Sequence, residues 1–210
     1  MPTLSSSSPV TVGIDVGGLK KGFHAVALRD GRFHAKITSR DAAEIANWCR
    51  DLGAVCIGID APCHWRGPEK ARAAEVALMR AGIHCFSTPT KEMAESHPSG
   101  FFHWMVNGAS MFAHLDLSHP LFKGSETPLP TSFETFPQAI ACALAGKRLS
   151  AQDKRRERRQ LLESAGVCTQ KLGNIDWLDA GLCALTAYRL TDGRWQAYGD
   201  LETGFIVVPR

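Results

Sequence analysis

The sequence has no long hydrophobic run, no closely spaced cysteine pair and no strong excess of charge of one sign. No apolar stretch approaches the roughly 18 residues that a membrane helix requires, so we predict no membrane association. A net charge of +3 over 210 residues is compatible with an anionic substrate. It is too small to indicate a protein that binds nucleic acid by charge alone.

The seven cysteines and residues 1–9 indicate the cellular compartment. The seven cysteines form no CxxC pair, which favours reduced thiols and a cytoplasmic protein. Residues 1–9 are rich in serine and lack the basic start and apolar segment of a signal peptide. We therefore expect a disordered tail over 1–9 and a single domain over 10–210. Four cysteines have apolar neighbours and are expected in the core: Cys56, Cys85, Cys142 and Cys183.

Hydrophobic periodicity predicts an α/β fold. Short β-branched runs bounded by glycine predict strands, and apolar stripes with capping residues predict helices. Ser39 is the expected N-cap of the first helix, and the strand after that helix should run parallel to the first strand. Residues 88–130, rich in proline, histidine and aromatics, are expected to form an insertion or lid with one or two helices within 92–115. The predicted strands are 10–16, 22–28, 33–38, 54–59, 83–87, 132–135, 193–198 and 204–208. The predicted helices are 39–51, 68–81, 137–145, 151–164 and 174–190.

Two apolar strands each end in an aspartate, at Asp15 and at Asp60. A buried carboxylate costs several kcal/mol unless it is paired or binds a metal. Two like charges at one edge of a sheet would also repel each other unless a cation lies between them. The alternatives are a turn or cap role for Asp15 before the glycines and an Asx-type turn for Asp60.

The last predicted helix carries two further carboxylates, Asp176 and Asp179, three residues apart and therefore on one face. Acidic residues in a first turn are also favoured by the helix dipole alone. If this face meets the two strand ends, up to four carboxylates gather, and Mg²⁺ or Mn²⁺ prefers such oxygen ligands. We predict metal ligation by Asp15, Asp60 and Asp179, with Asp176 or Glu134 completing a catalytic set.

The order of these elements and several short motifs resemble a family of predicted RNase H-like nucleases, domain of unknown function 429. The late Asp-x-x-Asp is also similar to the acidic pair of RuvC-like resolvases. The resemblance implies an RNase H-like fold: a mixed five-stranded sheet, three antiparallel strands and then parallel ones, with helices on both faces. It spans nearly the whole chain except the serine-rich tail. The matching stretches are 13–15, 58–62, Arg72 with Glu75, 134–137, 176–180 and 204–209.

Several other side chains are candidates for the site. Glu134 ends a strand and is either a further ligand or a structural hydrogen-bond acceptor. Arg72 and Glu75 form an (i, i+3) pair on a helix, or contact substrate phosphate or carboxylate. Lys20 and Lys21 follow two glycines and either meet a phosphate or form a solvated turn.

Two groups carry less information. His97, His103, His114 and His119 match no zinc spacing, so we expect ordinary histidines, with a general base or substrate contact as the alternative. The basic run over 154–159 indicates a solvated helix face or a contact with a phosphate backbone.

The function favoured by these patterns is a Mg²⁺- or Mn²⁺-dependent nuclease or phosphodiesterase acting on nucleic acid or another phosphate-containing substrate. One alternative is a non-catalytic protein that binds nucleic acid, a nucleotide or a partner. Another is a hydrolase or transferase for a small anion. The glycine pair is also similar to the phosphate loop of actin-like kinases, but the chain is too short for their two domains. A homodimer remains open.

Overall fold

A computed structural model describes residues 8–67, 71–124, 128–150 and 152–210. Its elements alternate as the hydrophobic pattern predicts, with glycine and aspartate at most of the boundaries. The strands are β1 (Val10–Val16), β2 (Phe23–Arg29), β3 (Arg32–Ser39), β4 (Ala54–Asp60), β5 (Thr131–Glu134), β6 (Trp195–Asp200) and β7 (Gly204–Pro209). The helices are α1 (Ala42–Asp51), α2 (Ala73–Arg80), α3 (Lys91–Ser96), α4 (His103–Leu115), α5 (Pro137–Ala145), α6 (Lys154–Ser164) and α7 (Ile175–Thr191).

One mixed sheet organises the molecule, with strand order β3-β2-β1-β4-β5-β7-β6. β1, β2 and β3 form an antiparallel meander, and β4 and β5 continue the sheet parallel to β1. This is the RNase H-like arrangement. The expected five-stranded sheet corresponds to β1–β5, with β3 at one edge, and the closing pair β6 and β7 extends it beyond β5, so the sheet has seven strands instead of five.

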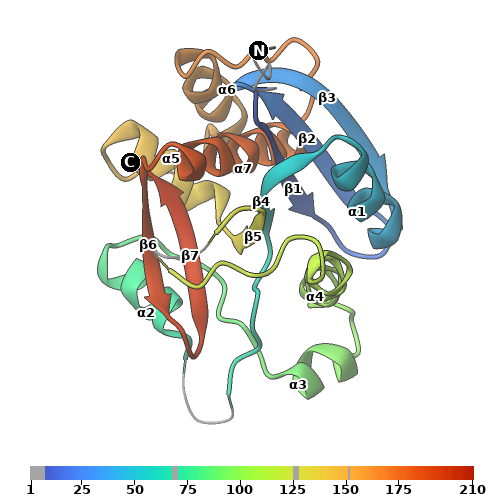
Figure 1. The fold of residues 1–210 in the computed structure, drawn as a ribbon. Coiled ribbons are helices and arrows are strands. Elements are labelled where there is room, and N and C mark those ends of the chain that lie inside the picture. The colour runs from blue at the N-terminus through green and yellow to red at the C-terminus, as the bar shows by residue number, and fades with distance from the viewer. Residues whose placement is uncertain (1–7, 68–70, 125–127, 151) are drawn as a thin grey trace.

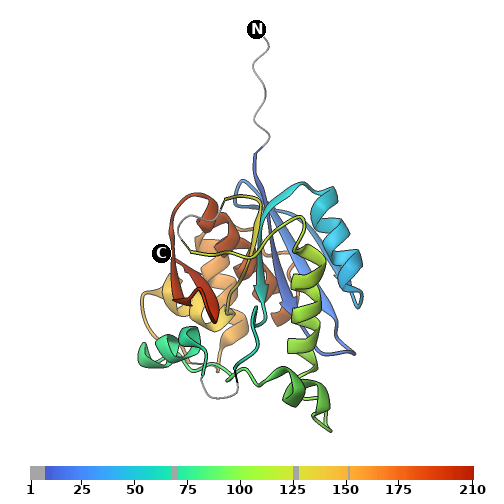
Figure 2. The ribbon, with the colours of Figure 1, turned by 60° about the horizontal axis from the view of Figure 1, so that its bottom comes forward.

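Helices cover both faces of the sheet (Figure 1). α1 and α4 pack on one face, where Ile45, Met111 and Leu115 meet the apolar side chains of β1 and β4. α5, α6 and α7 lie on the other face in a second apolar cluster with α2 and β7. The view in Figure 2 shows α1 and α4 side by side over the same part of the sheet.

The central helix α7 lies unusually close to the sheet because two strand glycines face it. A Cβ added to Gly13 would lie 2.0 Å from the backbone nitrogen of Ala184, and one added to Gly58 would lie 2.8 Å from the carbonyl oxygen of Cys183. No real Cβ fits at such distances, so glycine at these positions is a packing requirement. The close approach holds α7 against β1 and β4, the two strands that end in aspartate.

Some local expectations are wrong. Residues 83–87 form no strand, and the N-cap of α1 is Asp41, whose carboxylate accepts from the backbone N–H of Ala43. Ser39 instead donates its hydroxyl to Glu44. The predicted helix over 68–81 is observed from Ala73, and the one over 151–164 from Lys154.

Parts of three expectations lie outside the described residues: the tail before residue 8, the helix start at 68–70 and the helix start at 151. Within the expected insertion, two helices form, α3 and α4. α4 is tied to the sheet because the side-chain amide of Asn107 donates to the carbonyl oxygen of Gly17 at 2.8 Å. The insertion therefore reaches the loop that follows β1.

Candidate metal centre

Three carboxylates end three adjacent parallel strands at one edge of the sheet. Asp15 of β1 is in register with Asp60 of β4, and Glu134 of β5 is in register with Ile59 of β4. The carboxyl ends of parallel strands are where open α/β sheets bind ligands. The acidic edge expected from the strand endings is therefore present in the structure.

Asp15 is a buried carboxylate that has no hydrogen bond at one of its two oxygens in the described part of the chain. Its side chain is 8% exposed, and its Oδ2 makes no hydrogen bond within the described residues. Burial raises the pKa of Asp15 to about 7, against the lowering effect of Lys21, and the nearby Asp179 and Asp176 raise it further. Such an atom is costly unless a cation or a donor approaches it.

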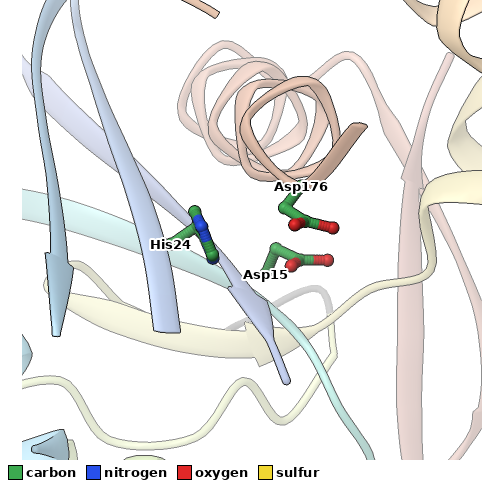
Figure 3. A group of neighbouring side chains, drawn as sticks. All are labelled: Asp15, His24 and Asp176. Atoms are coloured by element: carbon green, nitrogen blue, oxygen red, sulfur yellow. The ribbon is translucent and has the colours of Figure 1, made fainter. Parts of the chain in front are cut away.

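Asp15, His24 and Asp176 bring their ligand atoms together within 4.8 Å of one another. Figure 3 shows the three side chains side by side, from β1, β2 and the first turn of α7. The antiparallel register places His24 directly opposite Asp15. Asn174 caps α7 by accepting from the backbone N–H of Trp177, which fixes the turn that carries Asp176.

His24 was not among the residues predicted from the sequence. Burial lowers its pKa, so the imidazole is neutral near pH 7 and able to bind a metal. Its ring packs edge-on to Trp177 at 4.7 Å, and its buried Nδ1 has no hydrogen-bond partner in the described part of the chain. The only signal in the sequence was a histidine near the start of the strand that follows the Asp15 turn.

A lysine already supplies positive charge to this group. The ammonium of Lys21 lies 2.5 Å from Asp176 Oδ1 and 3.6 Å from Asp15 Oδ2. Partial desolvation lowers the pKa of Lys21, but the two carboxylates outweigh it and the net shift is upward. Lys20 and Lys21 are both exposed. The two lysines differ in that, among the described residues, only Lys21 forms ion pairs with these carboxylates.

Asp60 and Asp179 lie outside the group formed by Asp15, His24 and Asp176, whose ligand atoms are within 4.8 Å of one another. Burial raises the pKa of Asp60 well above its ordinary value, and Asp15 and Asp179 raise it further. Asp179 is ion-paired with the buried guanidinium of Arg158 from α6. Burial raises the pKa of Asp179 to about 6, although Arg158 acts in the opposite direction. Residue spacing alone does not identify this pair.

Glu134, Arg72 and Glu75 form a buried network on the other side of Asp60. Arg72 is 1% exposed, and its guanidinium donates to Glu134 and to Glu75. Glu134 Oε2 also accepts from the backbone N–H of Cys63 at 2.8 Å. These contacts agree with the structural alternatives considered above: an ion pair for Arg72 and Glu75, and a hydrogen-bond acceptor for Glu134. Arg72 is buried and is not open to substrate.

The basic run of α6 is used mainly within the protein. Arg158 pairs with Asp179, Arg155 donates to the carbonyl oxygen of Gly173, and Arg159 donates to those of Thr169 and Leu172. These contacts hold the loop between α6 and α7. The run is therefore not a purely solvated face. Three of its arginines are also already engaged within the protein and are not free to bind phosphate.

The fold and the acidic edge define an α/β protein of the RNase H-like class. The chain belongs to the family described as Protein of unknown function (DUF429), whose model matches residues 13–203. Among solved structures, it is similar to a structure titled "Thermus thermophilus RuvC structure", at 14% identity and a TM-score of 0.46. That match covers 88% of this chain and 96% of the other. No curated protein matches.

Within the described residues, no helix is both long and apolar enough to cross a membrane. All seven cysteines are free. Of the four expected in the core, Cys56, Cys142 and Cys183 are buried, and Cys85 is partly buried.

Proposed function

We propose that this protein is a divalent-metal-dependent phosphodiesterase or nuclease. The observation that carries the proposal is the convergence of Asp15, His24 and Asp176, in which Asp15 Oδ2 and His24 Nδ1 are buried without hydrogen-bond partners. Native proteins satisfy nearly all such atoms, and a cation held by these three side chains would give Asp15 Oδ2 a partner.

The donor set fits Mn²⁺ or Mg²⁺. Two carboxylates provide the hard oxygen ligands that both ions prefer, and the imidazole of His24 shifts the balance toward Mn²⁺. Bound there, the ion would activate a water and neutralise charge on a phosphate group. Asp15, His24 and Asp176 would hold it.

The neighbouring residues have supporting roles in this proposal. Asp60, in register with Asp15, adds a third carboxylate on the side of β4, and Asp179, ion-paired with Arg158, adds a fourth from α7. Glu134 stays paired with Arg72 and keeps the end of β5 in place. We propose that Lys20, the exposed neighbour of Lys21, meets the substrate phosphate and that the substrate is a nucleic acid or a nucleotide.

A hydrolysis assay tests the activity directly. Purified protein is incubated with single- and double-stranded DNA and RNA and with a small phosphodiester such as bis(4-nitrophenyl) phosphate, in Mn²⁺, Mg²⁺ or EDTA. Hydrolysis that requires metal and falls at least about 100-fold in Asp15→Asn and Asp176→Asn supports the proposal, because metal ligation and charge stabilisation are then lost together. Asp51→Asn, an exposed aspartate at the end of α1, is the control. Hydrolysis that is unchanged in both site variants would contradict it.

A non-catalytic binding protein is the second candidate. It is favoured by Lys21, whose ammonium already neutralises part of the charge on Asp15 and Asp176. Under this alternative, the protein binds nucleotides or nucleic acid in EDTA as tightly as in Mn²⁺ and hydrolyses none of them.

A further inference from the structure

A pocket of about 210 Å³ opens beside the acidic edge, and Asp60 is part of its lining. Three of its walls are aromatic: Phe86 from the segment before α3, Trp104 from α4 and Phe136 from the start of α5. The volume is below the roughly 300–1,000 Å³ of pockets that hold drug-sized ligands. It is therefore suited to one small ring system rather than to a peptide segment.

The pocket also contains a carboxylate with spare accepting capacity. Glu75 is 5% exposed and lines the pocket. Its Oε1 accepts from the backbone N–H of Thr88 at 3.1 Å and from the Thr88 hydroxyl at 2.5 Å. Its Oε2 is buried and has no hydrogen-bond partner among the described residues.

Two other polar side chains of the pocket, Glu134 and Thr135, are already engaged, while Asp60 is a further carboxylate of its lining. Glu134 receives the guanidinium of Arg72, and the hydroxyl of Thr135 donates to the carbonyl oxygen of Val207. Among the described residues of this lining, Glu75 Oε2 is thus the one acceptor that is fully buried and has no hydrogen-bond partner. A ligand that matches the pocket must be flat, largely apolar and equipped with an N–H donor.

We propose that this pocket binds a nucleobase that carries an exocyclic amino group, with the base against Phe86 and Trp104 and its N–H donating to Glu75. Aromatic walls favour a planar ring because bases stack on aromatic side chains in proteins that bind single strands. Phe86 is well placed for this role, since 61% of it is exposed and its ring lies 6.2 Å from that of Trp104.

The position of the pocket connects it to the proposed function, on which the choice of a nucleotide rests. Asp60 belongs both to the pocket and to the acidic edge, where it is in register with Asp15. A base held in the pocket therefore brings its sugar and phosphate toward the carboxylates. The substrate class that follows is an unpaired nucleotide: a single strand, a strand end or a free nucleotide.

The test is calorimetric titration of nucleosides into the whole protein in EDTA, with adenosine and purine riboside as the matched pair. The two differ by the amino group, and a site with an unpaired buried acceptor rejects the ligand that lacks the donor. We expect adenosine to bind about 10-fold or more tighter than purine riboside, the range for a hydrogen bond to a charged group. Ribose 5-phosphate, which has no base, should not compete.

Two variants locate the site. Glu75→Gln keeps an oxygen for Thr88 and places an amide donor where Oε2 lies, so the preference for adenosine over purine riboside should disappear. Phe86→Ala removes an exposed ring and should weaken both nucleosides by about 5-fold or more. Leu117→Ala, fully exposed and outside this pocket, should leave both affinities unchanged.

The outcomes separate this inference from the proposed function. If adenosine and purine riboside bind equally, or neither binds, or Glu75→Gln leaves the preference intact, the base pocket is overturned whatever the protein does with metal. If the nucleosides bind as expected but the protein neither binds Mn²⁺ nor hydrolyses a phosphodiester, the pocket stands and the phosphodiesterase proposal fails.

Discussion

At the scale of single residues, the burial of Asp15 makes the stability of the protein depend on pH. Its pKa is about 7 in the folded protein against an ordinary value of 3.8. The folded state thus binds more protons than the unfolded state between these two pH values. Since stability then falls as pH rises, the metal-free protein should lose stability between about pH 4 and pH 7.

Replacing this carboxylate tests that statement. Asp15→Asn should be more stable than the wild type at pH 8 by about 1–4 kcal/mol and nearly equal to it at pH 4, because a neutral amide has no charge to desolvate. Urea unfolding in EDTA at the two pH values measures the difference. Asp60 and Asp179 act in the same direction, so the variant flattens only part of the slope. The opposite result would be an Asp15→Asn variant that is less stable than the wild type at pH 8. It would show that neighbouring groups stabilise the charged form of Asp15.

Lys21 leads to a second prediction at this scale, with its neighbour as the control. Lys21→Met keeps the length of the stem and removes the ammonium between Asp15 and Asp176. We expect Mn²⁺ to bind about 5-fold tighter, because the competing cation is gone, and the metal-free protein to lose about 1 kcal/mol. Lys20→Met should change neither quantity, since among the described residues Lys20 forms no ion pair with Asp15 or Asp176. Weaker Mn²⁺ binding in Lys21→Met would mean that Lys21 supports the site instead of competing for it.

Residue-level features were predictable from the sequence to different degrees. Asp15 and Asp60 could be found because each ends an apolar strand, where a carboxylate needs a physical reason. His24 could not, because its place opposite Asp15 depends on the register of β1 and β2, which one residue of slippage would reverse. The pairing of Arg158 with Asp179 joins two helices across a loop, and nothing in the spacing of α6 marked one arginine as buried.

At the scale of elements, the site depends on how closely α7 lies on β1. Gly13 faces the backbone of α7 so tightly that no side-chain atom fits between them. The helix carries Asp176 in its first turn, so any outward displacement of α7 moves that carboxylate away from Asp15 and His24. The packing of one glycine thereby controls the geometry of the acidic group.

Gly13→Ala is accordingly expected to be among the most damaging single-methyl changes in the chain. Its added Cβ would meet the backbone of α7 at about 2 Å, so the helix must shift, at a cost of about 3 kcal/mol or more. Thermal unfolding monitored by circular dichroism measures the loss. Gly173→Ala, where nothing lies within 4 Å of the added atom, is the control and should unfold within a few degrees of wild type. Equal melting temperatures for the two variants would contradict the packing described for α7 and β1.

Element prediction worked best where the pattern was local. The two strands that end in Asp15 and Asp60 could be predicted because a short apolar run closed by an aspartate determines each of them. The run 83–87 was mistaken for a strand since a short apolar run does not distinguish a strand from an extended loop that covers a pocket. The start of α1 was misplaced by two residues because Ser39 and Asp41 are both good caps.

At the scale of the whole molecule, the sheet gathers side chains from distant parts of the sequence at one edge. β1, β2, β4 and α7 supply the acidic group and its neighbours, and the insertion between β4 and β5 supplies Trp104 to the adjoining pocket. The fold class could be predicted from the order of elements, and the acidic edge could be predicted from that class. The members of the metal-binding group could not be predicted, because they depend on distances between side chains.

The central claim is that Asp15, His24 and Asp176 form a cation site, and calorimetric titration of Mn²⁺ tests it without any assumption about substrate. The account predicts that the wild type and the control Asp51→Asn bind Mn²⁺, and that Asp15→Asn and Asp176→Asn lose binding while remaining folded by circular dichroism. Absence of binding at millimolar Mn²⁺ in the wild type, or unchanged affinity in both site variants, would contradict the account.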